Sequence, residues 1–508
     1  MKTLQDIAAQ VQGAQIDGQP DIEIKDIEHD SRKVQAGTLF VCIPGVHTDG
    51  HMFIPQAVRA GAVAVLTTKK RAAIEAMGIQ LPDSIAVLTV PELDAALDVM
   101  VPYFHDYPAR AMRVIGITGT NGKTTTSYIT RGILRAAGYK VGLIGTIKIM
   151  IEEESFPIHN TTPDVVELQH ILATMRDRGM DYVVMEVSSH ALAQGRVSGI
   201  EFDTCVFTNL TQDHLDFHKT FENYRLAKAK LFDLVSQPGT KQGKTAVVNI
   251  DDESGKVMLE HAHCNHITYG IEHEADLRAT DIDVLASGAH FTLRNDAFGA
   301  AGMKLSLHIT GIFNVYNVMS AVGAALAEHI APEVIARVLA DFHSVPGRFE
   351  LVDAGQDFSI IVDYAHTPDG VENVLKTARQ IAKRHIIAVF GCGGDRDRTK
   401  RPIMGRLAAE LADVVIATSD NPRSEDPEAI LREVEAGVQE EIGSKYHECI
   451  ADRRTAIRRA VELAQPDDIV VILGKGHEDY QILADRTIHF DDREEARAAV
   501  ALKLGQAE

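Results

Sequence analysis

A strand–loop–helix unit near residues 113–138 constrains the fold of this chain more than any other feature. The apolar run RVIGITG predicts a buried strand, and TTTSYITRGILRAAG predicts a helix that ends near Gly138. Backbone amides and the positive dipole end at a helix start favour an anion there. The connecting run therefore predicts a loop that binds the phosphates of ATP, formed by Gly119, Thr120, Asn121, Gly122, Lys123, Thr124 and Thr125.

Within this loop, Lys123 is expected to reach the terminal phosphates and Thr124 to coordinate Mg²⁺. The common G-x4-GK[ST] spacing is not met, because Gly116 lies one residue too far from Gly122. Gly119 is the nearer glycine, so the loop is a variant of the usual form.

The rest of the chain predicts an α/β fold with largely parallel sheets, because helical periods and short β-branched runs alternate along it. Five apolar runs lead into polar or glycine-rich loops, where ligands bind in such sheets. We expect three domains: residues 1–106 forming an α/β domain, 107–341 forming a central P-loop ATPase domain with a mostly parallel sheet, and 342–508 forming a Rossmann-like α/β domain. The runs are VIGITGTNGKT, YVVMEVSSH, TCVFTNLTQDH, IIAVFGCGGDRDR and DIVVILGKGHED.

Composition narrows the function. The formal charge of −21 argues against sequence-independent nucleic-acid binding, which needs a basic surface. The five cysteines are scattered without a CxxC pair, so neither a disulfide framework nor a zinc site is indicated. No apolar run has the length of a signal peptide or a membrane span. We expect a soluble cytoplasmic enzyme that is monomeric and acts on small molecules.

A second group of polar residues follows two further predicted strands. Glu186 ends the run YVVME, and Asp213 and His214 follow TNLTQ. A carboxylate at a strand end in a P-loop protein commonly holds Mg²⁺ or its water. Two alternatives stay open at this point: Glu186 as a solvated loop carboxylate, and His214 as a helix-start residue bonded locally.

Several motifs in fixed order closely resemble the Mur ligase family, the ATP-dependent amide-bond ligases of peptidoglycan precursor synthesis. The resemblance covers essentially the whole chain. It implies that residues 1–106 bind the uridine nucleotide of the substrate and that residues 342–508 bind the added amino acid. It also implies a role in cell-wall biogenesis, cell shape and cell division. The segments NTTPD, EVSSHALAQGR and DNPRSEDP are similar to the family member that adds the third peptide residue. The motifs are DSRKVQAGTLFVCIPG, GTNGKTT, EVSSHAL, TNLTQDHLDFH, YRLAKAKLF, GIFNVYN, PGRFE and DYAHTPDG.

The resemblance implies a reaction in which the γ-carboxylate of D-Glu in UDP-MurNAc-L-Ala-D-Glu becomes an acyl phosphate, which the amine of the next amino acid attacks. It also implies the residues that bind the two nucleotides. On the ATP side these are Asn314, Asn317, Arg348 and His366, the last two approaching from the third domain. The contacts to the UDP-sugar dipeptide are Ser31, Asn160, Thr161, Thr162, Ser188, Gln194 and Arg196.

The resemblance further implies that Lys228 reacts with CO₂ to form a carbamate. An ammonium would repel Mg²⁺, whereas a carbamate offers it an anionic oxygen. Glu186 and His214 would share that metal, beside the Mg²⁺ at Thr124, and Lys123, Glu186, His214 and Lys228 form the expected catalytic set.

The motif DNPR resembles the signature of the diaminopimelate-adding ligases. Meso-2,6-diaminopimelate differs from L-lysine by one carboxylate, which Arg423 would bind in a two-pronged contact. The simpler alternative is a surface arginine paired with Glu425 or Asp426. The full set implied for this amino acid is Arg396, Asp420, Asn421, Pro422, Arg423, Gly474 and Glu478.

Three other functions are weighed against this one. A lysine-adding ligase of the same family is the nearest, and a folate polyglutamate ligase is expected to lack the N-terminal block and DNPR. An ATP-gated binding protein without catalysis is disfavoured by the presence of Lys123, Glu186, His214 and Lys228.

Overall fold

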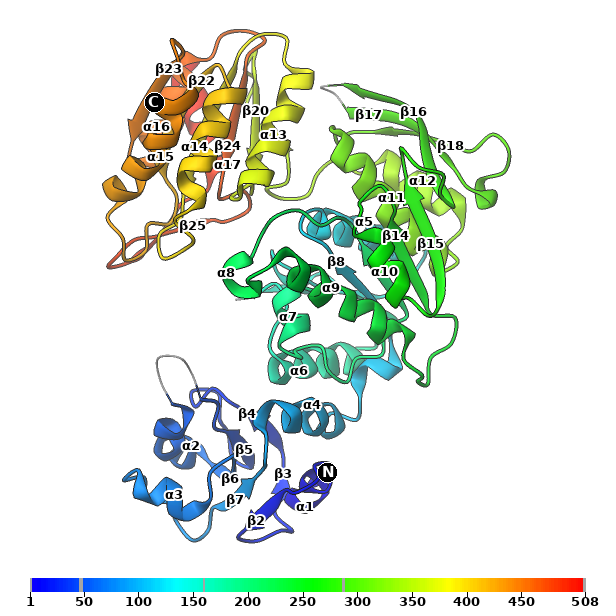
Figure 1. Ribbon diagram of the computed structural model, residues 1–508, viewed down its shortest axis with the longest axis vertical. Coiled ribbons are helices and arrows are strands. Elements are labelled where there is room, and N and C mark those ends of the chain that lie inside the picture. The colour runs from blue at the N-terminus through cyan, green and yellow to red at the C-terminus, as the bar shows by residue number, and fades with distance from the viewer. Residues whose placement is uncertain (1, 45–48, 159, 286–287, 506–508) are drawn as a thin grey trace.

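The computed structural model describes residues 2–44, 49–158, 160–285 and 288–505. Within these residues the strands form three large sheets of 5, 11 and 6 strands. Each sheet belongs to a separate body, and the three bodies follow one another along the long axis of the molecule (Figure 1). The expected fold class, an α/β protein of three domains, is confirmed.

The first domain is built on the sheet β2-β7-β6-β5-β4, in which only the β2–β7 pair is antiparallel. Its core packs against α4 and also against Val165 and Val166 at the start of α6, which joins this domain to the next. Its elements are β1 (Lys2–Thr3), α1 (Leu4–Ala8), β2 (Gln15–Asp17), β3 (Glu23–Ile24), β4 (Asp26–Glu28), β5 (Thr38–Val41), η1 (Gly50–Phe53), α2 (Ile54–Ala60), β6 (Ala62–Thr67), α3 (Arg71–Ala76), β7 (Ala86–Thr89) and α4 (Leu93–Phe104).

The central domain carries the largest sheet, in the order β11-β10-β9-β12-β8-β13-β14-β15-β16-β17-β18. Along the sheet, the neighbours β9, β12, β8, β13, β14, β15 and β16 all pair in parallel. The carboxyl ends of β8, β12 and β13 therefore lie at one edge. Its elements are η2 (Pro108–Ala111), β8 (Arg113–Thr118), α5 (Lys123–Ala136), β9 (Val141–Ile144), β10 (Ile149–Ile151), β11 (Glu154–Phe156), α6 (Val165–Asp177), β12 (Tyr182–Glu186), α7 (Ser189–Ala193), β13 (Thr204–Phe207), α8 (Leu215–His218), α9 (Phe221–Ser236), β14 (Thr245–Asn249), α10 (Gly255–His261), β15 (Asn265–Gly270), β16 (Leu277–Leu285), β17 (Gly288–Arg294), η3 (Asp296–Phe298), β18 (Met303–Leu307), α11 (Ile312–Ala327) and α12 (Pro332–Ala340).

Two parts of this sheet depart from the expected alternation of helices and strands. At one end, β10 pairs in antiparallel register with both β9 and β11. From β16 to β18 three strands follow one another in antiparallel register without α-helices between them. The burial of β18 alternates residue by residue, which is typical of a strand with one covered face, and α12 covers it. The expectation of alternating elements from end to end is therefore wrong for residues 141–156 and 277–307.

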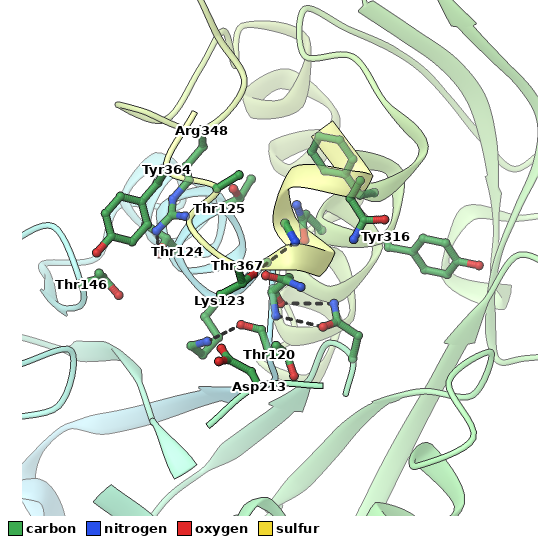
Figure 2. A pocket seen from close by; sticks show the side chains of 18 of the residues that line it. Thr120, Lys123, Thr124, Thr125, Thr146, Asp213, Tyr316, Arg348, Tyr364 and Thr367 are labelled. Atoms are coloured by element: carbon green, nitrogen blue, oxygen red, sulfur yellow. Dashed lines mark hydrogen bonds between the residues drawn. The ribbon is translucent and has the colours of Figure 1, made fainter. Parts of the chain in front are cut away.

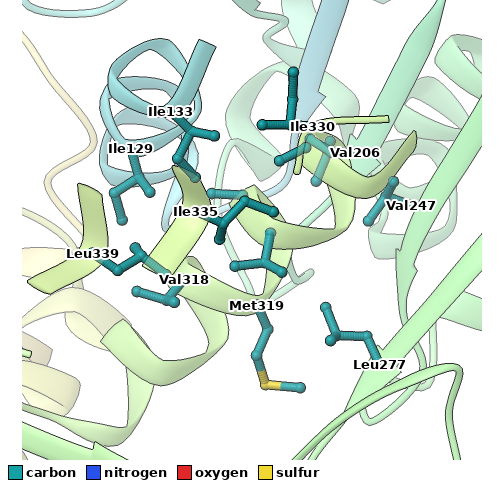
Figure 3. Close-up of a cluster of buried hydrophobic side chains, with 14 of the residues drawn as sticks. Ile129, Ile133, Val206, Val247, Leu277, Val318, Met319, Ile330, Ile335 and Leu339 are labelled. Carbon is teal, nitrogen blue, oxygen red and sulfur yellow. The ribbon is translucent and has the colours of Figure 1, made fainter. Parts of the chain in front are cut away.

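The helix after the phosphate loop is fixed by the main core of the central domain. Ile129 and Ile133 of α5 pack with Ile335 and Leu339 of α12 and with residues of α11 (Figure 3). Gly138, with φ +99°, ends the helix as expected: its amide bonds to Arg135 and the amide of Tyr139 to Leu134. Packing of α5 against the core thus fixes the position of the helix, and with it the position of the helix start.

The third domain has the sheet order β19-β20-β24-β21-β22-β23, in which only the β19–β20 pair is antiparallel. The ends of β21, β22 and β24 therefore meet at one edge. Its elements are β19 (Glu350–Leu351), β20 (Ser359–Asp363), α13 (Pro368–Ile381), β21 (Ile386–Cys392), α14 (Lys400–Leu411), β22 (Val414–Ser419), α15 (Pro427–Glu441), β23 (Tyr446–Ile450), α16 (Arg453–Leu463), β24 (Ile469–Leu473), β25 (Tyr480–Ile482), β26 (Thr487–His489) and α17 (Asp492–Lys503).

The linkers between the sheets lie after α4 and after α12. The boundaries proposed at residues 106/107 and 341/342 stay predictions, since sheet membership alone does not fix where a domain ends.

Candidate active site

The phosphate loop connects β8 to α5, and two glycines give it its shape. Gly119 has φ +151° and Gly122 has φ +85°, which side-chain-bearing residues rarely adopt. A Cβ at Gly119 would lie 1.9 Å from Oγ1 of Thr208, and one at Gly122 would lie 2.2 Å from Oδ1 of Asn317. Both positions therefore require glycine for conformation and for space.

Asn209, which follows β13, pins this loop from the side. Its carbonyl accepts from the Thr120 amide at 2.9 Å, and its Oδ1 accepts from the Asn121 amide at 2.9 Å. Its own Nδ2 donates to the Asn121 carbonyl at 3.2 Å. The polar run after β13 thus supports the loop directly, besides carrying Asp213 and His214.

Two lysines converge on the carbonyl of Gly119. Lys123 Nζ donates to the carbonyls of Gly119 and Thr120, both at 2.8 Å. Lys228 Nζ, from α9, donates to Gly119 at 2.8 Å and lies 4.6 Å from the centre of the Tyr224 ring. Burial lowers the pKa of both, and the charge of Lys123 adds to the lowering at Lys228, which is only 1% exposed. A buried amine held in this way loses its proton more readily than a surface lysine.

Glu186 is the last residue of β12 and is fully buried. Its Oε2 accepts from the hydroxyls of Thr124 at 3.1 Å and Thr146 at 2.8 Å, and its Oε1 accepts from the Thr146 amide at 3.1 Å. The alternative of a solvated loop carboxylate is therefore wrong. A hydroxyl and a carboxylate side by side at the cavity are oxygen donors of the kind that suits Mg²⁺.

His214 sits at the start of α8 with φ +54° and lines the same cavity. Its Nε2 lies 3.4 Å from Asp213 Oδ2, and burial, with help from the charges of Lys123 and Lys228, lowers its pKa to about 4. Over the ranges that the structure describes, no three His, Cys, Asp or Glu side chains gather as a metal site. Glu186 and His214 are the two residues of these types in the expected metal set, and the part of Lys228 in that set stays a prediction.

Most of the residues expected to bind the UDP-sugar dipeptide gather beside Glu186. Thr162 Oγ1 donates to the Glu186 carbonyl at 2.9 Å and accepts from the Ser188 amide at 3.0 Å. Arg196 donates to the Thr162 carbonyl at 3.0 Å and to Gln194 Oε1 at 2.7 Å. Asn160, which precedes this group in the chain, is exposed, and Ser31, which follows β4 in the first domain, is buried.

The phosphate loop, Glu186, His214 and Ser188 face a cavity of about 470 Å³ between the central and third domains. Arg348, from the third domain's edge, donates to Thr124 Oγ1 at 3.2 Å and lies over the Tyr364 ring at 4.7 Å. Figure 2 shows Lys123 and Thr124 on one side, with Arg348 beside Tyr364 and with Tyr316 across from them. Of the expected residues, the lining includes Thr120, Asn121, Gly122, Lys123, Thr124, Thr125, Thr161, Glu186, Ser188, His214, Asn317, Arg348 and His366.

The two asparagines of α11 differ in their access to the cavity. Asn317 lines it, and its Nδ2 donates to Asn314 Oδ1 at 3.0 Å. Asn314 is buried behind it and donates to the Thr310 carbonyl at 2.8 Å. Asn314 therefore orients Asn317 in this structure, while Asn317 is the one placed to meet a ligand.

In the third domain, a buried lysine joins two of the residues expected to bind the added amino acid. Asn421 Nδ2 donates to Glu478 Oε2 at 2.9 Å. Lys475, which is fully buried, donates to the same Glu478 oxygen at 2.9 Å and to Asn421 Oδ1 at 3.2 Å. Gly474 packs so closely that a Cβ there would lie 2.4 Å from Asp420 Oδ2. The loops after β22 and β24 thus form one polar surface.

Arg423 and Arg396 lie on either side of Gly393 at this surface. A Cβ at Gly393 would meet Arg423 NH1 at 2.9 Å and Arg396 Cγ at 3.8 Å. Arg423 donates to the carbonyls of Gly394 at 2.8 Å and Asn421 at 3.4 Å, whereas Glu425 is bound by Arg401. The simpler alternative for Arg423, a surface pair with Glu425 or Asp426, is therefore wrong for the described residues. Its guanidinium keeps donors for an incoming anion.

The residues expected to bind the added amino acid lie outside the lining of the 470 Å³ cavity, and their role stays a prediction. Pro422 completes this amino-acid cluster, with its carbonyl against Gly394. The ring of Tyr364, which lines the cavity, lies 4.9 Å from the ring of His477, which belongs to the same loop as Gly474 and Glu478.

Three family models match this chain in succession. Residues 23–113 match "Mur ligase family, catalytic domain", residues 117–325 match "Mur ligase middle domain", and residues 347–476 match "Mur ligase, glutamate ligase domain". The chain belongs to the Mur ligase family.

Relatives of this Mur ligase match along nearly the full length. A UDP-N-acetylmuramoyl-L-alanyl-D-glutamate–2,6-diaminopimelate ligase from Geobacillus thermodenitrificans is 48% identical over 95% of this chain and 96% of its own length. A ligase of the same name from Syntrophomonas wolfei is 44% identical over 94% of this chain and 95% of its own. A solved structure of that name has 32% identity and a TM-score of 0.67, with 99% of each chain covered.

More distant structures support the fold alone. MurF from Acinetobacter baumannii superimposes with a TM-score of 0.66 at 19% identity, covering 92% of this chain and 94% of its own.

Among the residues described here, no helix combines the length and the apolar character needed to cross a membrane.

Two residues of the Mur ligase site were not singled out from the sequence, although both lie inside quoted motifs. Lys475 stands between Gly474 and Glu478, and Asp369 ends the charged part of DYAHTPDG. The identity of a single residue does not show whether a lysine is buried or exposed. Its position between two expected ligand residues is the signal that could have indicated its role.

Proposed function

We propose that this Mur ligase uses ATP to join meso-2,6-diaminopimelate to the γ-carboxylate of D-Glu in UDP-MurNAc-L-Ala-D-Glu. One observation carries the proposal. A single cavity of about 470 Å³ brings together the phosphate loop, Thr161 and Ser188 of the dipeptide set, and Arg348 and His366 of the third domain. The full-length relatives that bear this ligase name support the same activity.

The chemistry requires two anions to approach one another. The D-Glu carboxylate attacks the γ-phosphorus of ATP, the bond to ADP breaks, and an acyl phosphate forms. The neutral amine of the amino acid then attacks the acyl carbon, and the tetrahedral intermediate expels phosphate. Lys123 and Arg348 flank the cavity and would balance the charge of the transferred phosphoryl group.

The side chains at the cavity fit Mg²⁺, which would neutralise phosphate oxygens when bound. Thr124 Oγ1 and Glu186 Oε2, 3.1 Å apart, are the donors for one ion. For the second, we propose His214, Glu186 and a carbamate on Lys228. The Lys228 amine adds to the carbon of CO₂ and releases one proton, a step that needs the neutral amine and suits a lysine whose burial lowers its pKa.

The choice of amino acid rests on the cation cluster at Gly393. Arg423 and Arg396 would bind the distal carboxylate of diaminopimelate, while Glu478 and Asn421 would hold its ammonium. L-Lysine lacks that carboxylate, so it would leave Arg423 without its partner. We expect discrimination of roughly 10- to 1,000-fold in favour of diaminopimelate.

One assay tests the whole proposal. The full chain is mixed with UDP-MurNAc-L-Ala-D-Glu, ATP and Mg²⁺, and phosphate release is followed with diaminopimelate, with L-lysine and with neither. We expect release only when the dipeptide and an amine are both present, and faster with diaminopimelate. Phosphate release that does not depend on the dipeptide and the amine would contradict the ligase activity. Absence of release would favour an ATP-gated binding protein. Faster turnover with lysine than with diaminopimelate would contradict the proposed specificity.

The remaining parts of the proposal concern the setting of the reaction. We propose that the enzyme acts in the cytoplasm on peptidoglycan precursors, as a monomer and without a nucleic-acid partner. The strongly acidic balance, −21, supports the last point. A mass measured by light scattering in solution would test the monomer.

A further inference from the structure

Asp369 is carried by the third domain but bonds to the central one. It lies in the first turn of α13, which Thr367 caps by accepting from the Gly370 amide at 3.1 Å. Its Oδ2 accepts from Asn121 Nδ2 at 2.5 Å and from Thr211 Oγ1 at 2.9 Å. One carboxylate oxygen therefore ties the phosphate loop and the segment after β13 to the third domain.

Both partners of Asp369 belong to the support of the phosphate loop. The Thr211 amide donates to Thr120 Oγ1 at 3.0 Å, and that hydroxyl donates back to the Thr211 carbonyl at 3.2 Å. Asn121 is held on its backbone side by Asn209. Asp369 thus closes a chain of bonds that fixes Thr120 and Asn121, two residues of the cavity lining.

The position of Asp369 relative to the cavity separates it from the ligand contacts. Its neighbours Thr367 and Gly370 line the cavity, whereas its own carboxylate is taken up by Asn121 and Thr211 behind the loop. A carboxylate adds negative charge near a site for phosphates, so a stabilising effect on ATP must come from the geometry that it imposes. Such an effect would also depend on where the third domain sits.

We propose that Asp369 is a positioning residue for ATP: by binding Asn121 and Thr211 from the third domain, it holds the phosphate loop in its ATP-binding shape. The proposal rests on the proposed function for the identity of the nucleotide. It adds that the third domain, besides supplying Arg348, sets the affinity of a loop that belongs to another domain.

Titration calorimetry of the full chain with Mg²⁺ and a non-hydrolysable ATP analogue tests this without any acceptor. We expect Asp369→Ala to weaken binding about tenfold, since two bonds to an acidic acceptor are lost. The matched control is Glu372→Ala, which removes a carboxylate of the same helix that pairs with Lys376, and which should bind within twofold of the unsubstituted chain. Asp369→Ala binding within twofold would overturn the proposal.

A double substitution separates positioning from general damage. Thr211→Val removes one of the two bonds and should weaken binding about threefold; combined with Asp369→Ala it should add little, because both act through one network. If the loss of affinity in the double variant equals the product of the losses in the two single variants, the proposal is contradicted. If Asp369→Ala fails to fold, Thr211→Val still decides: unchanged binding overturns it.

Steady-state kinetics give a readout that a purely structural role would not move. The KM for ATP should rise in Asp369→Ala while the KM for the UDP-sugar dipeptide stays within twofold. If the unsubstituted chain itself does not bind the analogue, the proposed function fails; if it binds and the variants bind equally well, only the role of Asp369 fails.

Discussion

The phosphate loop of the central domain and the amino-acid cluster of the third domain both lie at the carboxyl ends of parallel strands, but they are held in different ways. The phosphate loop is one continuous segment, and backbone carbonyls of that segment bind Lys123 and Lys228. The amino-acid cluster comes from three separate loops joined by side-chain bonds, such as those of Asn421 with Lys475 and Glu478 and that of Arg401, on α14, with Glu425.

This difference indicates how each site tolerates change. The phosphate loop is shaped by its own glycines and the following helix, with added support from Asn209 and, by our proposal, from Asp369. A site made from three loops depends on buried charges, whose removal leaves partners unpaired at a cost of about 3–5 kcal/mol. The first site should therefore respond to substitution mainly in chemistry, and the second in both binding and stability.

The largest expected effect concerns Lys228. Lys228→Ala should lower kcat about 10²–10³-fold, because the proposed carbamate and its metal contact are lost, while the KM for diaminopimelate should stay within a few fold. Added formate or acetate should restore part of the rate by filling the space with a carboxylate. The measurement is phosphate release with increasing formate, against chloride at equal ionic strength.

Two outcomes would count against that assignment. Equal rates in formate and chloride would undermine the carbamate, and so would an unsubstituted enzyme that takes up no ¹³C-labelled CO₂ at a lysine by NMR. If Lys228→Ala also raises the KM for diaminopimelate, the phosphate loop and the amino-acid cluster are not held independently, and the comparison between them fails.

Arg423→Ala should have the next largest effect and should fall on the other site. We expect kcat/KM for diaminopimelate to drop about 10- to 100-fold through the loss of a charged hydrogen bond, with lysine affected less than fivefold. The KM for ATP should not change. A comparison with Arg432→Ala, an exposed arginine of α15 that lies 3.8 Å from Asp426, controls for the loss of charge. Equal losses for both amino acids would contradict the selective role.

The two regions also differ in how well the sequence predicts them. The phosphate loop could be located from a single run, because a strand, two glycines and a helix start are all local features. Lys228 and Arg423 required the family resemblance, since their chemistry depends on partners far away in sequence. Asp369 and Lys475 were not predicted, because each acts through a bond across domains or loops that no spacing reveals.

The antiparallel extension of the central sheet was missed for a related reason. Burial alternates along β18, but the sequence of an apolar strand looks the same whether its neighbour is parallel or antiparallel. Pairing is decided by the connection, and between β17 and β18 the short helix η3 stands where an α-helix was expected.

A smaller effect is expected from the ion pair beneath the amino-acid cluster. Arg453 and Asp492 are fully buried, and Arg453 also donates to the carbonyls of Ser419 at 3.4 Å and Leu473 at 2.9 Å, the last residues of β22 and β24. Replacing both by apolar residues, Arg453→Met with Asp492→Leu, removes the charges together and should leave the free energy of unfolding within about 2 kcal/mol.

Because the strand ends lose their common donor, the KM for diaminopimelate should rise several-fold in this double variant, with ATP binding unchanged. Urea unfolding and separate KM measurements check the two statements. Arg453→Met alone should be far less stable than the pair. A double variant with normal affinity for the amino acid would show that the three loops hold their positions without this support.

The smallest effect on activity is expected at the junction of the first and central domains, which neither compared region includes. His29 lies between Glu28, at 3.1 Å, and Asp164, at 3.3 Å, and the hydrogen bonds to Asp164 and Glu28 raise its pKa to about 10. A raised pKa means that the folded state binds a proton that the unfolded state releases above about pH 6.5. The stabilisation is therefore complete below that pH and declines as the pH rises toward 10.

His29→Gln should lower the free energy of unfolding by about 1–2 kcal/mol at pH 6, and the gap from the unsubstituted chain should close by pH 10. Urea unfolding at several pH values measures this, and a gap that stays constant with pH would contradict it. Turnover at pH 7 should change less than twofold, because the contact joins two domains without touching the phosphate loop or the amino-acid cluster.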